Sequence, residues 1–154
     1  MFPIPRPRGG DWLEDESRAW RRSGIDVVVS LLENEEAAHL DLLAEPQAAE
    51  SNAIQFVSFP IPDRGLPAST PAALSLLSQI TGALEQGKNV AVHCRQSIGR
   101  AGLIAAGVLI ASGVAPDRAL EAVISARGVT VPETSEQREW IRNLPSSQSV
   151  ASNR

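Results

Sequence analysis

The sequence of 154 residues contains one cysteine, Cys94, and two histidines, His39 and His93. A single cysteine cannot form an intramolecular disulfide, so disulfide cross-linking plays no part in holding the fold together. Two isolated histidines and one cysteine do not make a persuasive metal site either. We therefore expect no metal and no cofactor, and Cys94 is either inert packing or a chemically active group.

Long apolar runs are also missing. None approaches the roughly 20 residues that span a bilayer, and residues 1–6 lack the basic and apolar regions of a signal peptide. Basic residues are in the minority, with 14 Lys and Arg against 18 Asp and Glu and a formal net charge of −4. Such a chain has no general attraction for nucleic acid or for anionic membranes. We expect a cytoplasmic monomer that binds neither, and in which any anion site is local.

The sequence does contain alternating strand and helix signals. A β-branched apolar run predicts a buried strand at residues 25–32, a second apolar stretch halted by Pro60 predicts another strand at 54–59, and a short strand is expected at 89–93. Helical spacing of apolar residues, with capping and breaking residues at the ends, predicts helices within residues 11–24, 33–43, 70–87, 100–111, 116–128 and 134–144. This alternation predicts an α/β fold, a single three-layer domain whose mainly parallel sheet of about four to five strands is flanked by helices.

Helix starts are marked by capping residues. Asp11 is expected to cap the first helix, and Thr70 followed by proline predicts the start of another. Thr134 and Gln137 have the spacing of a capping box for the last helix. Residues 1–144 are expected to form one domain, and the polar, Ser-rich segment 145–154 a disordered tail.

The segment from Val90 to Gly102 reads as a strand, a loop from Cys94 to Arg100, and a helix. A loop between the carboxyl end of a strand and the amino end of a helix favours an anion, because unpaired N–H groups and the helix dipole point at it. The same field favours the thiolate form of Cys94, which can attack phosphorus. The planar guanidinium of Arg100 can bind two phosphate oxygens at once. The loop therefore predicts a phosphate site.

This arrangement, His93-Cys94-x5-Arg100 followed by Gly102, resembles the signature of the protein tyrosine and dual-specificity phosphatase superfamily. Further segments extend the likeness. Phe59–Pro67 is similar to the general-acid loop of small dual-specificity phosphatases, and Val131–Gln137 resembles the segment before their last helix. Two shorter motifs, Arg8-Gly-Gly-Asp-Trp12 and Ser30-Leu-Leu-Glu33, are similar to those of compact bacterial members. The resemblance covers most of the chain up to Leu144.

The resemblance implies a two-step hydrolysis of phosphate monoesters, with phosphotyrosine in proteins as the main substrate. A shallow pocket would also admit phosphoserine and phosphothreonine. Cys94 would take the phosphoryl group as phosphocysteine, and Asp63 would protonate the leaving oxygen and then activate water. His93 would orient the loop, and Gln137 would help to place the hydrolytic water. The main-chain N–H groups that would bind the phosphate with Arg100 are those of Arg95, Gln96, Ser97, Ile98 and Gly99.

Two positions depart from the family's pattern. Ala101 stands where these phosphatases usually carry a serine or threonine, whose hydroxyl bonds the cysteine sulfur and eases its departure from phosphorus. The absence of this hydroxyl is expected to slow phosphoenzyme breakdown roughly ten- to a hundredfold. Ser97 replaces a usual glycine, and its side chain either crowds the loop or donates a hydrogen bond within it.

Plainer interpretations stand beside several of these roles. Pro-Asp63-Arg-Gly is also a good turn in which an aspartate bonds its own backbone, and Gln137 is accounted for by the capping box alone. His93 at the end of a strand is ordinarily a satisfied, half-buried histidine with a structural role. The side chain of Arg95 is expected at the rim of the pocket, where it can touch the substrate.

Three other functions are alternatives to a dual-specificity-type phosphatase. A phosphate-binding pseudophosphatase with weak turnover is the main alternative because of Ala101. A rhodanese-type sulfurtransferase fits less well, since its loop is a residue shorter and leaves Asp63 without a role. Arsenate reductases and low-molecular-weight phosphatases carry their cysteine loop near the amino terminus, unlike position 94. The substrate stays open: the lack of lysine in the loop disfavours inositol phosphates, and a phosphorylated protein or a small phosphomonoester is expected.

Overall fold

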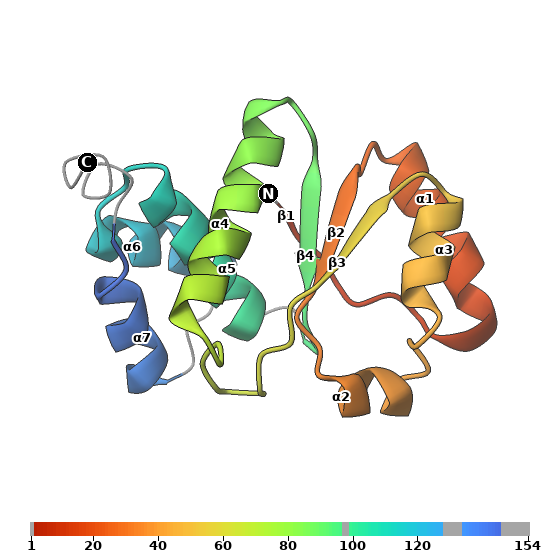
Figure 1. The fold of residues 1–154 in the computed structure, drawn as a ribbon, viewed down its shortest axis with the longest axis horizontal. Helices are drawn as coiled ribbons and strands as arrows, with labels where there is room; N and C mark the ends of the chain where they lie inside the picture. The colour runs from red at the N-terminus through yellow and green to blue at the C-terminus, as the bar shows by residue number, and fades with distance from the viewer. Residues whose placement is uncertain (1, 97–98, 128–133, 146–154) are drawn as a thin grey trace.

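The computed structural model describes residues 2–96, 99–127 and 134–145. Within them the chain forms one sheet in the order β1-β4-β2-β3, with every pairing parallel and helices on both faces (Figure 1). The strands are β1 (Phe2–Pro3), β2 (Val27–Ser30), β3 (Gln55–Ser58) and β4 (Val90–His93). The predicted three-layer α/β fold is confirmed. The predicted tail lies outside the described residues from position 146 onward.

The two central strands, β2 and β4, are buried along their whole length because helices cover both of their faces. Alternate residues of β2 therefore enter different cores. Val27 and Val29 join the larger core and Val28 joins the smaller one. In the register Ser30 pairs with both Ser58 and His93, so these three strands end at the same edge of the sheet.

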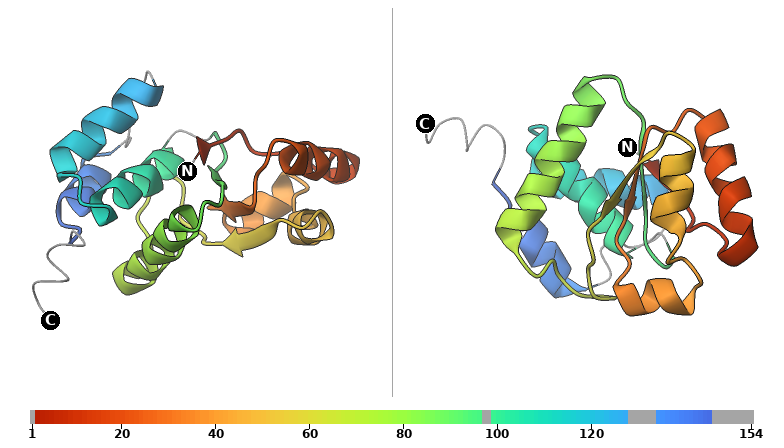
Figure 2. Two further views of the ribbon diagram at one scale, coloured as in Figure 1. Left: turned by 90° about the horizontal axis from the view of Figure 1, so that it is seen from above. Right: turned by 45° about the vertical axis from the view of Figure 1, so that its right-hand side comes forward.

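Each core is closed by its own set of helices, as the views of Figure 2 show. The smaller core contains Trp20 from α1 (Leu13–Arg22) and Ala49 from α3 (Glu45–Ser51). The larger core is built from four helices on the other face: α4 (Thr70–Glu85), α5 (Gly99–Ala111), α6 (Pro116–Arg127) and α7 (Ser135–Arg142). The short helix α2 (Asn34–His39) lies at the edge where β2 and β4 end (Figure 1).

The predicted helix over residues 33–43 is wrong in its extent. Helix α2 ends at His39, Asp41 has a φ of 59°, and a second helix, α3, begins at Glu45. A residue in the left-handed region cannot continue a helix, and Pro46 in the first turn of α3 marks a new start. The short strand β1 was also missed, since prolines at positions 3 and 5 hide a strand signal.

Two predicted caps are wrong and one is confirmed. A 3-10 turn, η1 (Gly10–Trp12), precedes α1, whose N-cap residue Trp12 makes no side-chain capping bond, so Asp11 does not cap that helix. Helix α4 begins at Thr70, but its N-cap residue is Ser69 and not Thr70. The Ser69 Oγ accepts a hydrogen bond from the Ala72 N–H at 3.2 Å. The capping box at the start of α7 is present as predicted.

Candidate active site

Three of the loops that follow parallel strands meet at the carboxyl edge of the sheet, where α/β sheets commonly bind ligands. The loop after β4 begins with Cys94, the connection after β2 carries Glu36 on α2, and the connection after β3 carries Asp63. A pocket of about 190 Å³ opens among them. Its lining residues are Asp63, Arg64, Cys94, Arg95, Gln96, Gly99 and Arg100. The structure thus brings together the three side chains that the sequence assigned to catalysis.

Cys94 directly follows β4 and is 3% exposed. It belongs to the larger core and at the same time lines the pocket. Helix α5 begins at Gly99, so the pocket faces the amino end of a long helix, where unpaired N–H groups and the helix dipole attract an anion. Ser97 and Ile98, the other two predicted main-chain ligands, lie outside the described residues.

Arg100 is 2% exposed, and hydrogen bonds fix its guanidinium. Nη1 and Nη2 donate to the two carboxylate oxygens of Glu36 at 2.6 and 2.9 Å, and Nη1 also donates to the carbonyl of Ile61 at 2.8 Å. A forked pair of this kind sets the plane of the guanidinium as well as its position. Arg100 is therefore held ready at the pocket before any anion arrives.

The two partners of this pair keep each other charged. Burial alone would lower the pKa of Arg100, but the hydrogen bonds and charge of Glu36, with the charges of Cys94 and Asp63, outweigh it and raise the pKa. In return the hydrogen bonds from Arg100 lower the pKa of Glu36 below its ordinary value. The pocket therefore holds a permanent positive charge although the whole chain is acidic.

Asp63 lies on an exposed turn at the rim of the pocket, with 65% of its side chain accessible. The Gly65 N–H donates to the carbonyl of Pro62 at 2.8 Å and closes the turn. The Asp63 Oδ1 atom lies 3.7 Å from Nη2 of Arg100. The turn that the plainer interpretation expected is present, and the same turn carries the carboxylate to the pocket.

His93 is fully buried beneath the loop and makes an unpredicted contact. Its Nε2 atom lies 2.6 Å from an oxygen of Glu45, which is also buried, and its ring stacks on Trp20 with centroids 6.4 Å apart. Its Nδ1 atom has no hydrogen-bond partner among the described residues. Glu45 therefore fixes the orientation of the ring that immediately precedes the cysteine.

Gln137 is buried at the start of α7 and is joined to the acid turn. Its Nε2 atom donates to the carbonyl of Gly65 at 2.9 Å, while its Oε1 atom accepts from the Thr134 N–H at 3.3 Å. It does not line the pocket. In this arrangement Gln137 anchors the turn that carries Asp63, and its predicted contact with water stays a prediction.

Two carboxylates that contact candidate site residues, Glu36 at Arg100 and Glu45 at His93, were not predicted from the sequence. Glu36 was assigned only to a helix, and Glu45 carried no assignment. The usable signals were their position shortly after a buried strand that ends beside the cysteine loop, and Pro46 as a helix start. Within the described parts of the chain, no group of three or more His, Cys, Asp or Glu residues could hold a metal, and no helix is long and apolar enough to cross a bilayer.

Known proteins resemble this chain in sequence and in structure. The model of the family described as "Polymorphic toxin system, DSP-PTPase phosphatase" matches residues 4–114. The solved structure of Tk-PTP in its active form is 30% identical and has a TM-score of 0.75, with 92% of this chain and 86% of that one covered. Kinase associated phosphatase with serine replacing its catalytic-site cysteine has a TM-score of 0.82 at 17% identity, covering 90% of this chain and 81% of that one. TpbA of P. aeruginosa has a TM-score of 0.64 at 19% identity, covering 92% of this chain and 81% of that one. No curated protein sequence matches.

Proposed function

Since the chain belongs to the DSP-PTPase phosphatase family of polymorphic toxin systems, we propose that it is a cysteine-dependent phosphatase that hydrolyses phosphate monoesters through a phosphocysteine intermediate. Phosphotyrosine in proteins is the main proposed substrate, with phosphoserine, phosphothreonine and small phosphomonoesters beside it. One observation carries the proposal: Cys94, Arg100 and Asp63 line one pocket at the amino end of α5. We place this activity in a cytoplasmic monomer.

In the first step the thiolate of Cys94 attacks phosphorus. The S–P bond forms as the P–O bond of the ester breaks, and Asp63 gives its proton to the leaving oxygen. The guanidinium of Arg100 and the N–H groups at the amino end of α5 stabilise the charge on the non-bridging oxygens. Because Glu36 already orients the guanidinium, little reorganisation is needed when the phosphate binds.

In the second step water attacks the phosphocysteine. Asp63, now a carboxylate, takes a proton from the water, the S–P bond breaks, and inorganic phosphate leaves with the thiolate restored. The Asp63 carboxyl thereby regains the proton that it gave up in the first step, and its exposed position at the rim of the pocket lets water reach it. No metal or cofactor is required for this sequence of steps.

Rapid-quench hydrolysis of p-nitrophenyl phosphate tests the proposal. We expect continuous, metal-independent release of nitrophenol and, in quenched samples, an intact protein mass increased by one phosphoryl group. Peptide mapping should place that group on residue 94. Release of nitrophenol with the phosphoryl group on another residue, or folded protein that neither turns over nor is labelled, would contradict the proposal.

Replacing Asp63 by asparagine tests the acid. The variant is expected to lose about 10²-fold in kcat/KM, at the lower end of the range for general acid catalysis because nitrophenol is a good leaving group. The alkaline limb of the bell-shaped pH profile should flatten, since it reports loss of the acid's proton. An unchanged alkaline limb would remove Asp63 from the mechanism.

A phosphate-binding protein with weak turnover is a second candidate, favoured by one observation. Ala101 is fully buried in the same core cluster as Cys94, so no hydroxyl at this position can assist departure of the sulfur. Ala101→Ser is expected to speed phosphoenzyme breakdown roughly ten- to a hundredfold, measured as the steady-state rate after the burst. A burst of nitrophenol without further turnover in the wild type would favour this candidate. An unchanged steady-state rate in Ala101→Ser would show that the missing hydroxyl at position 101 does not limit phosphoenzyme breakdown.

A further inference from the structure

A second cavity adjoins the catalytic pocket. It has a volume of about 350 Å³ and shares two lining residues, Arg95 and Gln96, with the catalytic pocket. Its other walls come from the segment that follows β1 and from the end of α2. The full lining is Pro5, Arg6, Pro7, Arg8, Gly9, Leu40, Arg95 and Gln96, and we call this cavity the Arg6 pocket.

The Arg6 pocket is positively charged. Three arginines, Arg6, Arg8 and Arg95, line it, and none of its described lining residues carries a carboxylate. Glu16 pairs with Arg8 and offsets part of its charge, but neither Arg6 nor Arg95 forms an ion pair with a described residue. In a chain with a net charge of −4, such a local excess of positive charge beside the catalytic loop attracts an anion.

The segment that carries Arg6 is held in place at both ends. The Ile4 N–H donates to the carbonyl of Val92 in β4, and the Gly10 N–H donates to the carbonyl of Asp41, each at 2.9 Å. At Gly9 the backbone approaches α2 so closely that a Cβ atom would lie 2.2 Å from the carbonyl oxygen of Leu40. Prolines at positions 5 and 7 stiffen the stretch between these anchors. The cavity is therefore preformed.

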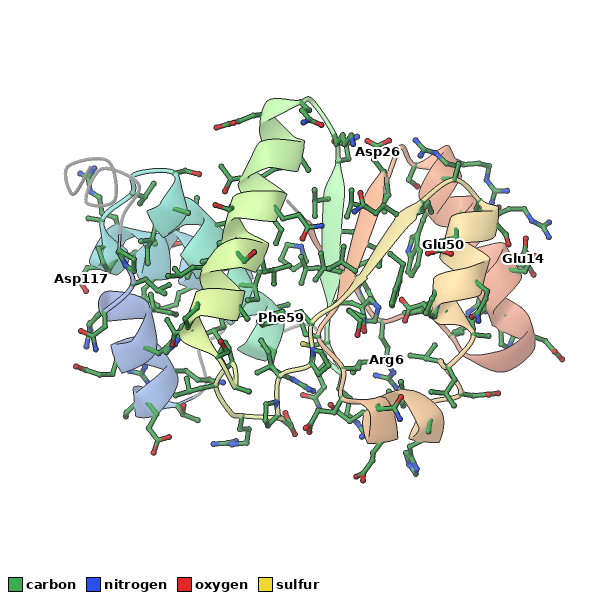
Figure 3. All side chains as sticks on the ribbon, in the orientation of Figure 1. Arg6, Glu14, Asp26, Glu50, Phe59 and Asp117 are labelled. Carbon is green, nitrogen blue, oxygen red and sulfur yellow. The ribbon has the colours of Figure 1, made fainter. Side chains whose placement is uncertain are left out.

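The Arg6 side chain also contacts the catalytic loop directly. Its Nη1 atom donates to the main-chain carbonyl of Arg95, the residue after the cysteine. Figure 3 shows Arg6 pointing toward the end of the molecule that holds α2, where β2 and β4 also end. A group bound to Arg6 would therefore lie beside the phosphate bound to Arg100 and within the reach of one substrate molecule.

We propose that the Arg6 pocket binds a second phosphate group of the substrate, so that the protein prefers phosphate monoesters carrying two phosphates. This inference rests on the proposed function. The guanidinium groups of Arg6 and Arg95 suit a phosphate, which offers several acceptor oxygens for forked donors, and Arg8 adds positive charge that Glu16 offsets only in part. The second phosphate is recognised and not cleaved, because none of the described residues that line the Arg6 pocket is a nucleophile. A doubly phosphorylated peptide and a small bisphosphate present the same chemistry.

The test compares kcat/KM for matched substrates with one and with two phosphates. One series uses a phosphotyrosine peptide with phosphoserine placed one to four residues to either side, and the other uses glucose 6-phosphate and glucose 1,6-bisphosphate. We expect a preference of about tenfold for the doubly phosphorylated member in at least one series. The series that shows it identifies the source of the second phosphate.

Two charge-matched variants locate the effect. Arg6→Gln is expected to bring the preference close to one, and the ratio of two substrates cancels any effect on the catalytic loop itself. Arg118→Gln removes the same charge from an exposed position on α6 and should leave the ratio within twofold of wild type. A preference below twofold in both series, or one that Arg6→Gln leaves unchanged, would overturn the proposal.

A titration without turnover separates this proposal from the proposed function. Inorganic phosphate is added to the protein at low ionic strength while amide NMR signals are followed. The signals of Arg6, Arg8 and Gly9 should shift in wild type and need about tenfold more phosphate in Arg6→Gln. Failure to hydrolyse p-nitrophenyl phosphate would contradict the proposed function, whereas unmoved signals at these three residues would contradict the second phosphate site.

Discussion

Cys94→Ser is expected to lower kcat for p-nitrophenyl phosphate by roughly 10⁴- to 10⁶-fold, as removal of a catalytic nucleophile does elsewhere. A serine hydroxyl is not ionised near neutral pH and is a far weaker nucleophile than a thiolate. Cys94 is buried, and serine is slightly smaller than cysteine, so the substitution introduces no steric clash and the fold should persist. The measurement is steady-state turnover with intact-mass detection of phosphoenzyme.

Phosphate binding provides the control for Cys94→Ser. Arg100 and the amino end of α5 are untouched, so inorganic phosphate should still shift the amide signals of Gly99 and Arg100. A variant that binds phosphate without turnover identifies the sulfur as the reacting group. Residual turnover within a hundredfold of wild type would place the nucleophile elsewhere.

Glu36→Gln is expected to have the largest effect on stability. The change leaves the guanidinium of Arg100 buried with one fewer charged partner. Removing one member of a buried ion pair costs about 3 kcal/mol, the lower end of the usual range, when the removed carboxylate was partly exposed. Glu36 is 13% exposed and Arg100 is 2% exposed. Turnover should also fall by about 10²-fold, because the guanidinium loses the carboxylate that orients it. Urea denaturation and kcat/KM measure the two effects.

Glu35→Gln is the matched control for Glu36→Gln. Glu35 lies on the same short helix, is exposed, and makes no ion pair with a described residue. Its replacement removes the same charge and should change the free energy of unfolding by less than about 0.5 kcal/mol. Equal destabilisation by the two variants would mean that the charge of α2, and not the pair with Arg100, stabilises the fold.

The contribution of Glu36 depends on pH with a defined sign. Its pKa in the folded protein is lowered, first by the hydrogen bonds from Arg100, so the folded state binds this proton less readily than the unfolded chain. The stabilisation is therefore complete above the unfolded pKa of about 4.5 and is lost as the pH falls through the lower folded pKa. The difference in unfolding free energy between wild type and Glu36→Gln should be full at neutral pH and shrink in acid. A difference that grows below pH 4 would contradict the pairing.

Local patterns allowed much of this protein to be predicted. Cys94 and Arg100 could be expected at one place because a strand, a short loop and a helix follow one another directly in the chain, and both residues line one pocket in the structure. Strands β2 and β4 were found because short apolar runs are buried on both faces in a parallel sheet, and the edge strand β3 because its apolar stretch ends at Pro60. The capping box at Thr134 was found for the same reason, since its two hydrogen bonds join residues three apart.

Contacts between distant segments could not be predicted in this way. Glu36 and Arg100 are 64 residues apart, Glu45 and His93 are 48 apart, and Arg6 and Arg95 are 89 apart. No spacing within the chain marks these pairs, because each depends on which strands become neighbours in the sheet. The helix predicted over residues 33–43 failed for a related reason: Asp41 adopts a left-handed backbone, and the apolar spacing continued across it.

The sequence by itself determined the α/β fold class and the strand, loop and helix that carry Cys94 and Arg100, because short-range patterns dictate strands, helices and the loops between them. The candidate acid Asp63 was predicted from the resemblance of Phe59–Pro67 to a known general-acid loop. Tertiary structure alone decided what supports these groups. The order β1-β4-β2-β3 brings the ends of β2 and β4 together, so Glu36 meets Arg100 and Glu45 meets His93. It also lays the segment after β1 beside the cysteine loop, which creates the Arg6 pocket. A buried charge needs a partner across space, and only the packing of the sheet determines which residue supplies it.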